Sequence, residues 1–280
     1  YYYSYFFHIT IFYWFSIYDK TTNVPKMECY NLYLYKMKIV QITDLHINSS
    51  NEKVRGEVDV RGNFLKLIDK LERIEYDYLV VSGDLCLSEG DPETYKWIKG
   101  YLDNTKKEYF IISGNHDDTK ILANVFDLEL TNNELFYKRT LGNQTIYFLD
   151  TSSYVWSNQQ MKWLDKELKN DKNKRPIIFI HHPPIISGVK YMDINHPLKN
   201  INEAKSFFQQ FDMKQFYVFC GHCHADNTVV EKNMNVFVTP SNYFQMKKEL
   251  DYVEIENNYT SYRLIEIKEG EIKSEVFFIT

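Results

Sequence analysis

Several features are scarce in this 280-residue chain, and each absence excludes a class of protein. The four cysteines, Cys29, Cys86, Cys220 and Cys223, are too few and too unevenly placed for the disulfide framework of a secreted protein. The 33 lysines and arginines are scattered and the formal net charge is −5, so no extended nucleic acid is expected as a partner. No apolar run predicts a membrane span. The chain is therefore expected in a reducing cytoplasm.

The first 36 residues differ in composition from the rest of the chain. They begin with YYYSYFFHITIFYWFSIYDK, which is dominated by Tyr and Phe and has neither the basic start nor the small-residue cleavage site of a secretory signal. We expect residues 1–36 to lie outside the working fold, with translation beginning at Met37 or at Met27. The alternative is an aromatic tail that binds a membrane surface or a protein partner. Residues 37–280 are expected to form a single domain.

From Met37 onward, short apolar strands alternate with amphipathic helices, a pattern typical of a layered α/β fold. We expect a helix over 63–74, a second over 92–101 with Asp91 as its N-cap, and a third after Ser157, which would form a capping box with Gln160. The last third of the chain turns β-rich. Its strands are expected near 228–238, 251–256, 262–267 and 273–279.

Residue types that bind metals follow five of the predicted strands. The motifs are D-L-H at 44–46, G-D at 83–84, G-N-H-D at 114–117, H-H at 181–182 and G-H-C-H at 221–224. Each motif alone is common in turns and loops. In an α/β sheet, however, the carboxyl ends of the strands gather at one rim, and these motifs hold six of the eight histidines. Together they predict a metal site at that rim.

The donor atoms indicate which metals the site would bind. Imidazole, carboxylate and amide oxygen suit Mn²⁺, Fe²⁺/Fe³⁺ or Zn²⁺, and a thiolate zinc site would need more cysteines. The pair Cys220 and Cys223 could also be half of a zinc site or a redox pair, but histidines interleave with it. Seven candidate ligands suit two ions bridged by one carboxylate.

Charge counting then favours a phosphate ester as the substrate. Two divalent ions bring +4, whereas two aspartates and one hydroxide bring −3, and the histidine and asparagine ligands are neutral. One net positive charge remains to hold an anion. Two ions roughly 3.5–4 Å apart can clamp phosphoryl oxygens and activate a bridging water.

The order of the five motifs resembles the calcineurin-like metallophosphoesterase superfamily, and the resemblance runs from Lys38 to the C-terminus. The stretches SGDLCLSEGDPETY, HHPPIISGVKYMD and TPSNYFQ are similar to those of the bacterial class III, or Icc-type, cyclic-nucleotide phosphodiesterases. The resemblance implies an αββα sandwich with two metal ions at the carboxyl ends of the strands. It also implies hydrolysis of a small phosphodiester, such as a 3′,5′-cyclic nucleotide like cyclic AMP, by a metal-bridging hydroxide.

The resemblance assigns each candidate ligand to one of two ions. It implies that the first ion is held by Asp44, His46 and His224. It implies that the second is held by Asn115, His181 and His222. Asp84 would bridge the two.

Four further roles are implied near these ligands. His116 resembles the catalytic histidine that contacts the phosphate and assists the leaving oxygen, and Asn115 and His224 would contact the substrate as well. His182 is expected outside the ligand set, as a supporting or hydrogen-bonded core histidine. Asp117 either orients His116 or caps the next helix.

Other activities stay open or fit less well. Protein Ser/Thr phosphatases carry Arg-Gly after G-D and a G-N-H-E motif, whereas this chain has Leu85 to Leu87 and G-N-H-D. Repair nucleases bring a larger extension for DNA. A glycerophosphodiesterase, a phosphomonoesterase and a non-catalytic metal-bound scaffold would share the metal centre and differ in the loops at 185–193 and 242–247. Members of the branch often form homodimers, so a monomer and a homodimer are both open.

Overall fold

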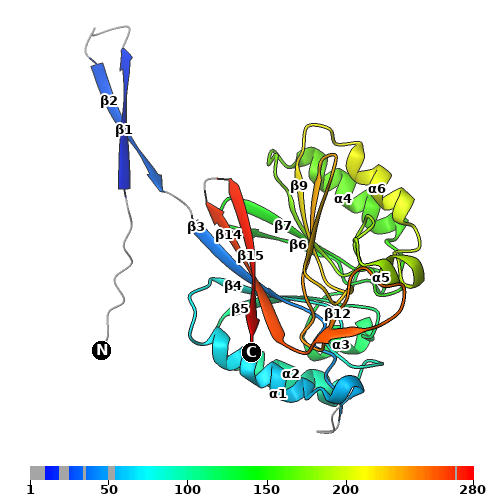
Figure 1. Cartoon of the computed structure of the whole chain (residues 1–280). Helices are drawn as coiled ribbons and strands as arrows, with labels where there is room; N and C mark the ends of the chain where they lie inside the picture. The colour runs from blue at the N-terminus through cyan, green and yellow to red at the C-terminus, as the bar shows by residue number, and fades with distance from the viewer. Residues whose placement is uncertain (1–9, 19–24, 34–35, 50–53, 269) are drawn as a thin grey trace, which may run out of the picture.

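Two β-sheets lie face to face at the centre of the computed structural model, which describes residues 10–18, 25–33, 36–49, 54–268 and 270–280 (Figure 1). The first sheet has the strand order β15-β14-β3-β4-β5. Its strands are β3 (Lys36–Ile42), β4 (Tyr78–Ser82), β5 (Glu108–Ile112), β14 (Thr260–Lys268) and β15 (Glu271–Ile279). Because β3, β4 and β5 are parallel neighbours, their carboxyl ends lie at one rim.

The second sheet has the strand order β10-β11-β9-β8-β7-β6. Its strands are β6 (Tyr137–Leu141), β7 (Gln144–Leu149), β8 (Ile177–Ile180), β9 (Phe216–Cys220), β10 (Asn227–Glu231) and β11 (Met234–Val238). Strands β7, β8, β9 and β11 are parallel, and antiparallel β6 and β10 close the two edges. The carboxyl ends of β8 and β9 therefore also lie together.

A mainly aliphatic and aromatic core joins the two sheets. Ile39 and Val80 of the first sheet belong to one buried cluster with Phe148, Phe179 and Phe219 of the second. The opposite face of each sheet is covered by helices, with α1, α2 and α3 on the first sheet and α4 and α6 on the second (Figure 1). These four layers confirm the predicted αββα sandwich.

The helices follow their predicted apolar faces more closely than their predicted ends. The helices are α1 (Val60–Leu71), α2 (Pro92–Asn104), α3 (Thr119–Val125), α4 (Asn158–Asn170), α5 (Lys190–Asn195) and α6 (Ile201–Gln209). Helix α1 starts three residues before its predicted start, because the Asp59 side chain accepts a hydrogen bond from the Gly62 N–H and caps it. Asp91 caps α2 as predicted.

The predicted capping box of α4 is half wrong. Ser157 caps the helix by accepting from the Gln160 N–H. The Gln160 side chain does not return this bond among the described contacts, because it pairs with the backbone N–H and carbonyl of Asp150. Gln160 therefore ties α4 to the end of β7.

The predicted C-terminal strands are present with different bounds. The segment expected as one strand at 228–238 is a hairpin of β10 and β11, and that near 251–256 is only the short β13 (Ile255–Asn257), paired with β12 (Gln245–Met246). Among the described strands, β1 (Thr10–Tyr18) and β2 (Pro25–Tyr33) pair only with each other. None of the described helices has the length and apolar character to span a membrane.

Candidate metal centre

All five predicted motifs meet at one rim, where the carboxyl ends of the two sheets lie together. Asp44 and His46 follow β3, Asp84 follows β4, and Asn115 follows β5. His181 follows β8 in the second sheet. His222 and His224 follow β9. The rim predicted from the sequence is therefore built from two sheets.

Most of these residues adopt a backbone conformation that is rare for side chains other than glycine. Positive φ angles occur at Asp44 (52°), His46 (46°), Asp84 (52°), His222 (69°) and His224 (49°). Such angles turn the chain sharply out of strand geometry, so that alternating residues can point the same way. Strained backbone of this kind is concentrated at functional sites, where packing enforces it.

Asp44, His46 and His224 bring their donor atoms together in a first group. The Nε2 atoms of His46 and His224 are 3.0 Å apart, and the Oδ1 atom of Asp44 lies 3.8 Å and 3.4 Å from them. All three side chains are buried. Two imidazoles and a carboxylate aimed at one point form a candidate site for a metal ion.

Asp84, His181 and His222 form a second group. The Oδ2 atom of Asp84 lies 3.3 Å from His181 Nε2 and 3.7 Å from His46 Nε2 of the first group. Asp84 therefore stands between the two groups, where a bridging carboxylate has to be. The buried Oδ1 atom of Asn115, which lines the same cavity, accepts no hydrogen bond from the described residues and is free to act as a ligand.

Backbone carbonyls hold three of the imidazoles in place. His181 Nδ1 lies 2.8 Å from the Ser82 oxygen, His222 Nε2 2.8 Å from the His196 oxygen, and His224 Nδ1 3.1 Å from the Phe244 oxygen. A carbonyl only accepts, so each of these nitrogens carries a proton and the other ring nitrogen is left to bind. Metal-binding histidines are commonly oriented in this way.

The electrostatics of the cluster favour added positive charge. Burial would raise the pKa of Asp44, but a hydrogen bond from His224 and the charges of His181 and His224 lower it to about 2. Burial would lower the pKa of His181, but the charge of Asp84 raises it to about 9. Burial lowers the pKa of His46 to about 3, so its imidazole is neutral and available to a metal. The donor set thus fits two divalent cations.

His116 lies beside both groups, with its side chain lining the cavity that they floor. Its backbone N–H donates to Asp84 Oδ1 at 2.8 Å. Its ring packs edge-on against His46, with ring centroids 4.9 Å apart. A nitrogen of His116 is also close enough to His46 and Asp84 for the three to hold a cation. Its position therefore fits a role toward the substrate and also a role as a ligand.

Asp117 does not cap the next helix, and no hydrogen bond among the described residues joins its carboxylate to His116. Asp118, not Asp117, is the N-cap of α3. The carboxylate of Asp117 instead accepts from the backbone N–H groups of Leu85, Cys86 and Gly114 and from the Tyr95 hydroxyl. It therefore ties the turn that carries Asp84 to the turn that carries Asn115. Burial and the charge of Asp84 raise its pKa to about 6.

His182 lies next to the cluster as a buried, hydrogen-bonded histidine. Its Nδ1 atom is 2.9 Å from the Thr151 hydroxyl, and its backbone N–H donates to the same oxygen. The His182 and His222 rings contact each other, with centroids 4.1 Å apart. His182 thus supports the ring of a candidate ligand, as expected from the sequence.

The cysteines near the site are buried packing residues. Cys86, Cys220 and Cys223 are free thiols, each at most 2% exposed. Burial raises the pKa of all three, in Cys86 to about 12 with a further contribution from the charge of Asp117. A thiol that keeps its proton is a poor redox group and a poor metal ligand, which argues against both thiol alternatives.

A cavity of about 230 Å³ opens over the two groups. Its walls include several residues that the sequence did not single out. They are Arg55, Tyr154, Tyr191, Met192, His196, Tyr243, Phe244, Met246 and Val253. Most of them come from the two segments at 185–193 and 242–247. The sequence indicated that these segments determine the substrate, but not which of their side chains line the cavity. Tyr154 had a weak signal, since it follows the apolar strand β7 toward the same rim.

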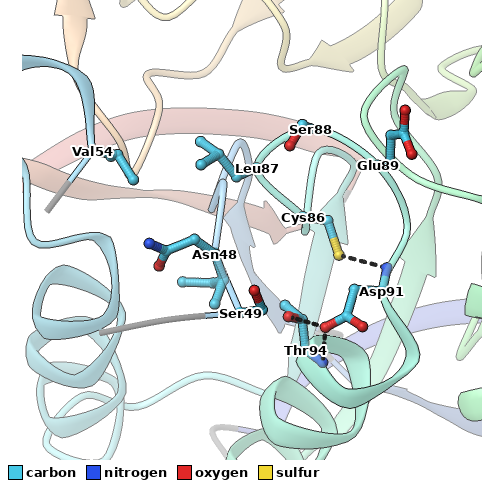
Figure 2. Close-up of a pocket in the computed structure, with 10 residues that line it drawn as sticks. Asn48, Ser49, Val54, Cys86, Leu87, Ser88, Glu89, Asp91 and Thr94 are labelled. Atoms are coloured by element: carbon cyan, nitrogen blue, oxygen red, sulfur yellow. Dashed lines mark hydrogen bonds between the residues drawn. The ribbon is translucent and has the colours of Figure 1, made fainter. Parts of the chain in front are cut away.

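A second cavity, of about 350 Å³, lies beside the metal centre and is lined by the segments that follow Asp84 and His46 (Figure 2). The two segments are joined by hydrogen bonds from Leu87 N–H to the Ile47 oxygen and from Ile47 N–H to the Leu85 oxygen. In Figure 2 the Cys86 sulfur accepts from the Asp91 N–H, and Asp91 holds Thr94. The start of α2 is thereby fixed to the turn that carries Asp84.

Several known proteins are similar to this chain in sequence. The chain is 32% identical over 244 residues to a probable cyclic nucleotide phosphodiesterase of Fibrobacter succinogenes, covering 86% of this chain and 94% of that protein. It is 27% identical over 250 residues to the 3′,5′-cyclic adenosine monophosphate phosphodiesterase CpdA of Vibrio vulnificus, covering 86% and 89%. It is 26% identical over 230 residues to the probable glycerophosphodiester phosphodiesterase GpdQ of Arcobacter nitrofigilis, covering 76% and 81%.

The fold is similar to that of a solved purple acid phosphatase, PPD1 from yellow lupin seeds, with a TM-score of 0.57 at 12% identity, covering 88% of this chain and 54% of that one. The model of the family described as calcineurin-like phosphoesterase matches residues 37–226, which include all the candidate ligands. The matched residues contain the whole buried cluster of carboxylates and imidazoles at the strand ends. The chain therefore belongs to the calcineurin-like phosphoesterase family.

Proposed function

We propose that this phosphodiesterase hydrolyses a 3′,5′-cyclic nucleotide such as cyclic AMP with the help of two divalent metal ions. The observation that carries the proposal is the composition of the 230 Å³ cavity, which has a polar floor and aromatic walls. Relatives named cyclic-nucleotide phosphodiesterases support it. A cyclic nucleotide has both parts that such a cavity suits, a phosphodiester for the floor and a planar base for the walls.

The aromatic walls contact histidines of both ligand groups. Tyr191 and His196 lie on the side of His222, whose Nε2 donates to the His196 oxygen. Tyr243 lies beside the first group, with its ring centroid 5.3 Å from that of His46. The two loops meet through a 2.9 Å hydrogen bond from the Lys190 N–H to the Lys248 oxygen. Aromatic and apolar walls gain more from a flat base than from the polar hydroxyls of glycerol.

The proposed ligand sets follow the two groups. Asp44, His46 and His224 would hold the first ion. Asn115, His181 and His222 would hold the second, with Asp84 shared. Imidazole with carboxylate and amide oxygens suits Mn²⁺, Fe²⁺/Fe³⁺ or Zn²⁺. When bound, the ions supply positive charge for the phosphoryl oxygens and make a water acidic enough to act as a nucleophile at neutral pH.

The side chains around the ions would position the diester and handle its proton. We assign His116 to the leaving oxygen, because its side chain faces the cavity while its N–H is anchored on Asp84. From there an imidazole can donate a proton as the bond to phosphorus breaks. Asn115 and His224 would touch the substrate from the floor of the cavity.

We further propose residues 37–280 as the catalytic domain and the cytoplasm as its location. The sheet pairing supports this domain, because β3 begins at Lys36 and, among the described strands, β1 and β2 pair only with each other. The three buried free thiols fit a reducing compartment.

A substrate panel tests the proposed activity. Metal-loaded protein is assayed with cyclic AMP, a glycerophosphodiester, bis(p-nitrophenyl) phosphate and the matching monoesters. We expect the highest kcat/KM with cyclic AMP. Preference for the glycerophosphodiester would favour the activity in the name of the GpdQ relative, and preference for monoesters would make the protein a phosphomonoesterase. Metal-loaded protein that turns over no ester would be a scaffold.

A further inference from the structure

Tyr154 lies at the edge of the candidate metal centre without belonging to either ligand group. It follows β7 in the segment Asp150–Trp156, and its half-buried side chain lines the same cavity as Asp84, His116 and His222. The ring contacts two histidines, with centroids 4.6 Å from that of His182 and 5.9 Å from that of His222. Tyr154 is thus close to the group that contains His181.

The backbone around Tyr154 is held rigidly in an unusual conformation. Its φ angle is 63°, which is uncommon for a bulky side chain. Its N–H donates to the Thr151 oxygen at 2.8 Å, and its own oxygen accepts from the Lys199 N–H at 2.9 Å. Strain that is enforced from both sides in this way is characteristic of residues placed for function.

The rest of the segment is fixed to its surroundings as well. Thr151 is hydrogen-bonded to His182, which follows β8, and Trp156 exchanges two hydrogen bonds with the Asn200 side chain, at 3.0 Å and 2.8 Å. The ammonium of Lys199 lies 5.5 Å from the centre of the Tyr154 ring. The side chain is therefore positioned in advance, with little freedom left to lose when a ligand binds.

The hydroxyl of Tyr154 is the part of the side chain that this packing leaves unused. None of the described residues forms a hydrogen bond with it, although Tyr154 lines the cavity together with Asp84 and His116. A tyrosine hydroxyl keeps its proton at neutral pH and can donate it to an anion. Inside a cavity built for a phosphodiester, the available acceptor is a phosphoryl oxygen.

We propose that Tyr154 is a substrate-binding residue whose hydroxyl donates a hydrogen bond to a non-bridging oxygen of the phosphoryl group, on the side of His222. The inference rests on the proposed diester hydrolysis for its substrate. It adds a neutral donor to the charges of the metal centre. It also gives a reason for the strained backbone, because a relaxed conformation at Tyr154 would turn the side chain elsewhere.

The test compares the wild type with Tyr154→Phe, which removes the hydroxyl and keeps the ring contacts with His182 and His222. Tyr217→Phe is the matched control, because Tyr217 is half-buried at the start of β9, far along the strand from the rim, and does not line the cavity. Each protein is loaded with metal and its metal content is measured. The readouts are kcat/KM with bis(p-nitrophenyl) phosphate and the dissociation constant of inorganic phosphate from calorimetry.

A hydrogen bond to a charged oxygen contributes about tenfold to a hundredfold, so we expect losses of that size in kcat/KM and in phosphate affinity for Tyr154→Phe. The variant should keep its two equivalents of metal, and Tyr217→Phe should match the wild type. The inference is overturned if Tyr154→Phe matches the wild type in both readouts. It is also overturned if the variant loses metal, since Tyr154 would then be a structural residue.

The phosphate measurement separates this inference from the proposed function. If the wild type cleaves the aryl diester but no cyclic nucleotide, the proposed substrate is wrong and Tyr154 is still tested. If the wild type cleaves no ester, weaker phosphate binding by Tyr154→Phe would still support the contact. If Tyr154→Phe then bound phosphate as tightly as the wild type does, the proposed contact would be wrong.

Discussion

The two sheets contribute different chemistry to the same rim. The first sheet supplies mainly oxygen donors, from Asp44, Asp84 and Asn115, together with one imidazole. The second sheet supplies only imidazoles among the candidate ligands. Each proposed ion would draw ligands from both sheets, so negative charge comes from one side and neutral nitrogen from the other. The metal centre therefore depends on how the sheets pack against each other and not on either sheet alone.

Direct contacts across the rim make this dependence concrete. The carboxylate of Asp44, after β3, accepts from the His222 N–H, after β9, at 2.9 Å. The Nδ1 atom of His181, after β8, lies against the Ser82 oxygen at the end of β4. Behind them, the buried core of Ile39, Phe148 and Phe179 sets the distance between the sheets. Predictions that remove charge from the first sheet, or push the sheets apart, test this view.

The largest effect is expected from Asp84→Asn. The carboxylate faces His46 and His181 at once, so its charge should support both ions. We expect occupancy of both to fall and turnover to drop by at least about 10³-fold. Metal analysis after dialysis measures the occupancy, and an activity assay measures the turnover. Asp69→Asn is the control, because Asp69 is an exposed residue of α1 paired with Arg73. Two retained equivalents of metal in Asp84→Asn would contradict a bridging carboxylate.

A smaller effect on metal, with a large effect on rate, is expected from His116→Ala. His116 follows β5 in the first sheet, and we assign it to the substrate and to neither ion. We expect both ions to stay bound and turnover to fall by roughly 10²–10⁴-fold, the range of general acid–base groups. Near-normal turnover would remove the role. Loss of one equivalent of metal would instead indicate that His116 is a metal ligand. Its closeness to His46 and Asp84 is compatible with that role.

Gly221→Ala introduces a steric clash where the two sheets approach each other. An added Cβ would lie 2.1 Å from Thr43 Oγ1 and 2.5 Å from Asp44 Oδ2, so the β9 turn would have to move away from β3. We expect a loss of about 1–3 kcal/mol in the free energy of unfolding, together with weaker metal binding. Denaturant unfolding and metal titration measure the two.

Gly100→Ala provides the matched control for this substitution. Gly100 lies inside α2, and an added Cβ there meets open space. Because alanine favours helix, this variant should gain about 0.5–1 kcal/mol and bind metal as the wild type does. If Gly221→Ala behaved in the same way, close approach of the two sheets would not limit the site.

Much of this site could be predicted from the sequence, because its information is local. Each candidate ligand lies a few residues after the end of an apolar strand, and the strand ends of a parallel sheet must lie together. The apolar face of α1, with Phe64, Leu67, Ile68 and Leu71, was visible for the same reason. What the residues alone left open was that two sheets share the rim, which followed only from the family resemblance.

The predictions that were wrong concern side chains whose hydrogen-bond partners lie in other parts of the fold. Asp117 binds the Leu85 N–H, 32 residues away, and Gln160 of α4 binds the backbone of Asp150, just after β7. Neither partner can be identified from neighbouring residues, because the fold brings it there. The same holds for Tyr154, whose place in the cavity follows from contacts with His182 and Lys199.

The smallest effect is expected from shortening the chain so that it begins at Met37. This residue is only 1% exposed, belongs to the core between the sheets, and pairs with Ile267 on β14. The rest of β3 keeps both of its neighbours, β14 and β4. The packing that brings the two sheets to one rim should therefore be unchanged, and the shortened chain should show the same free energy of unfolding and the same two equivalents of metal. Denaturant titration and metal analysis of both chains measure this. A shortened chain that failed to fold or to bind metal would show that residues 1–36 are part of the working protein.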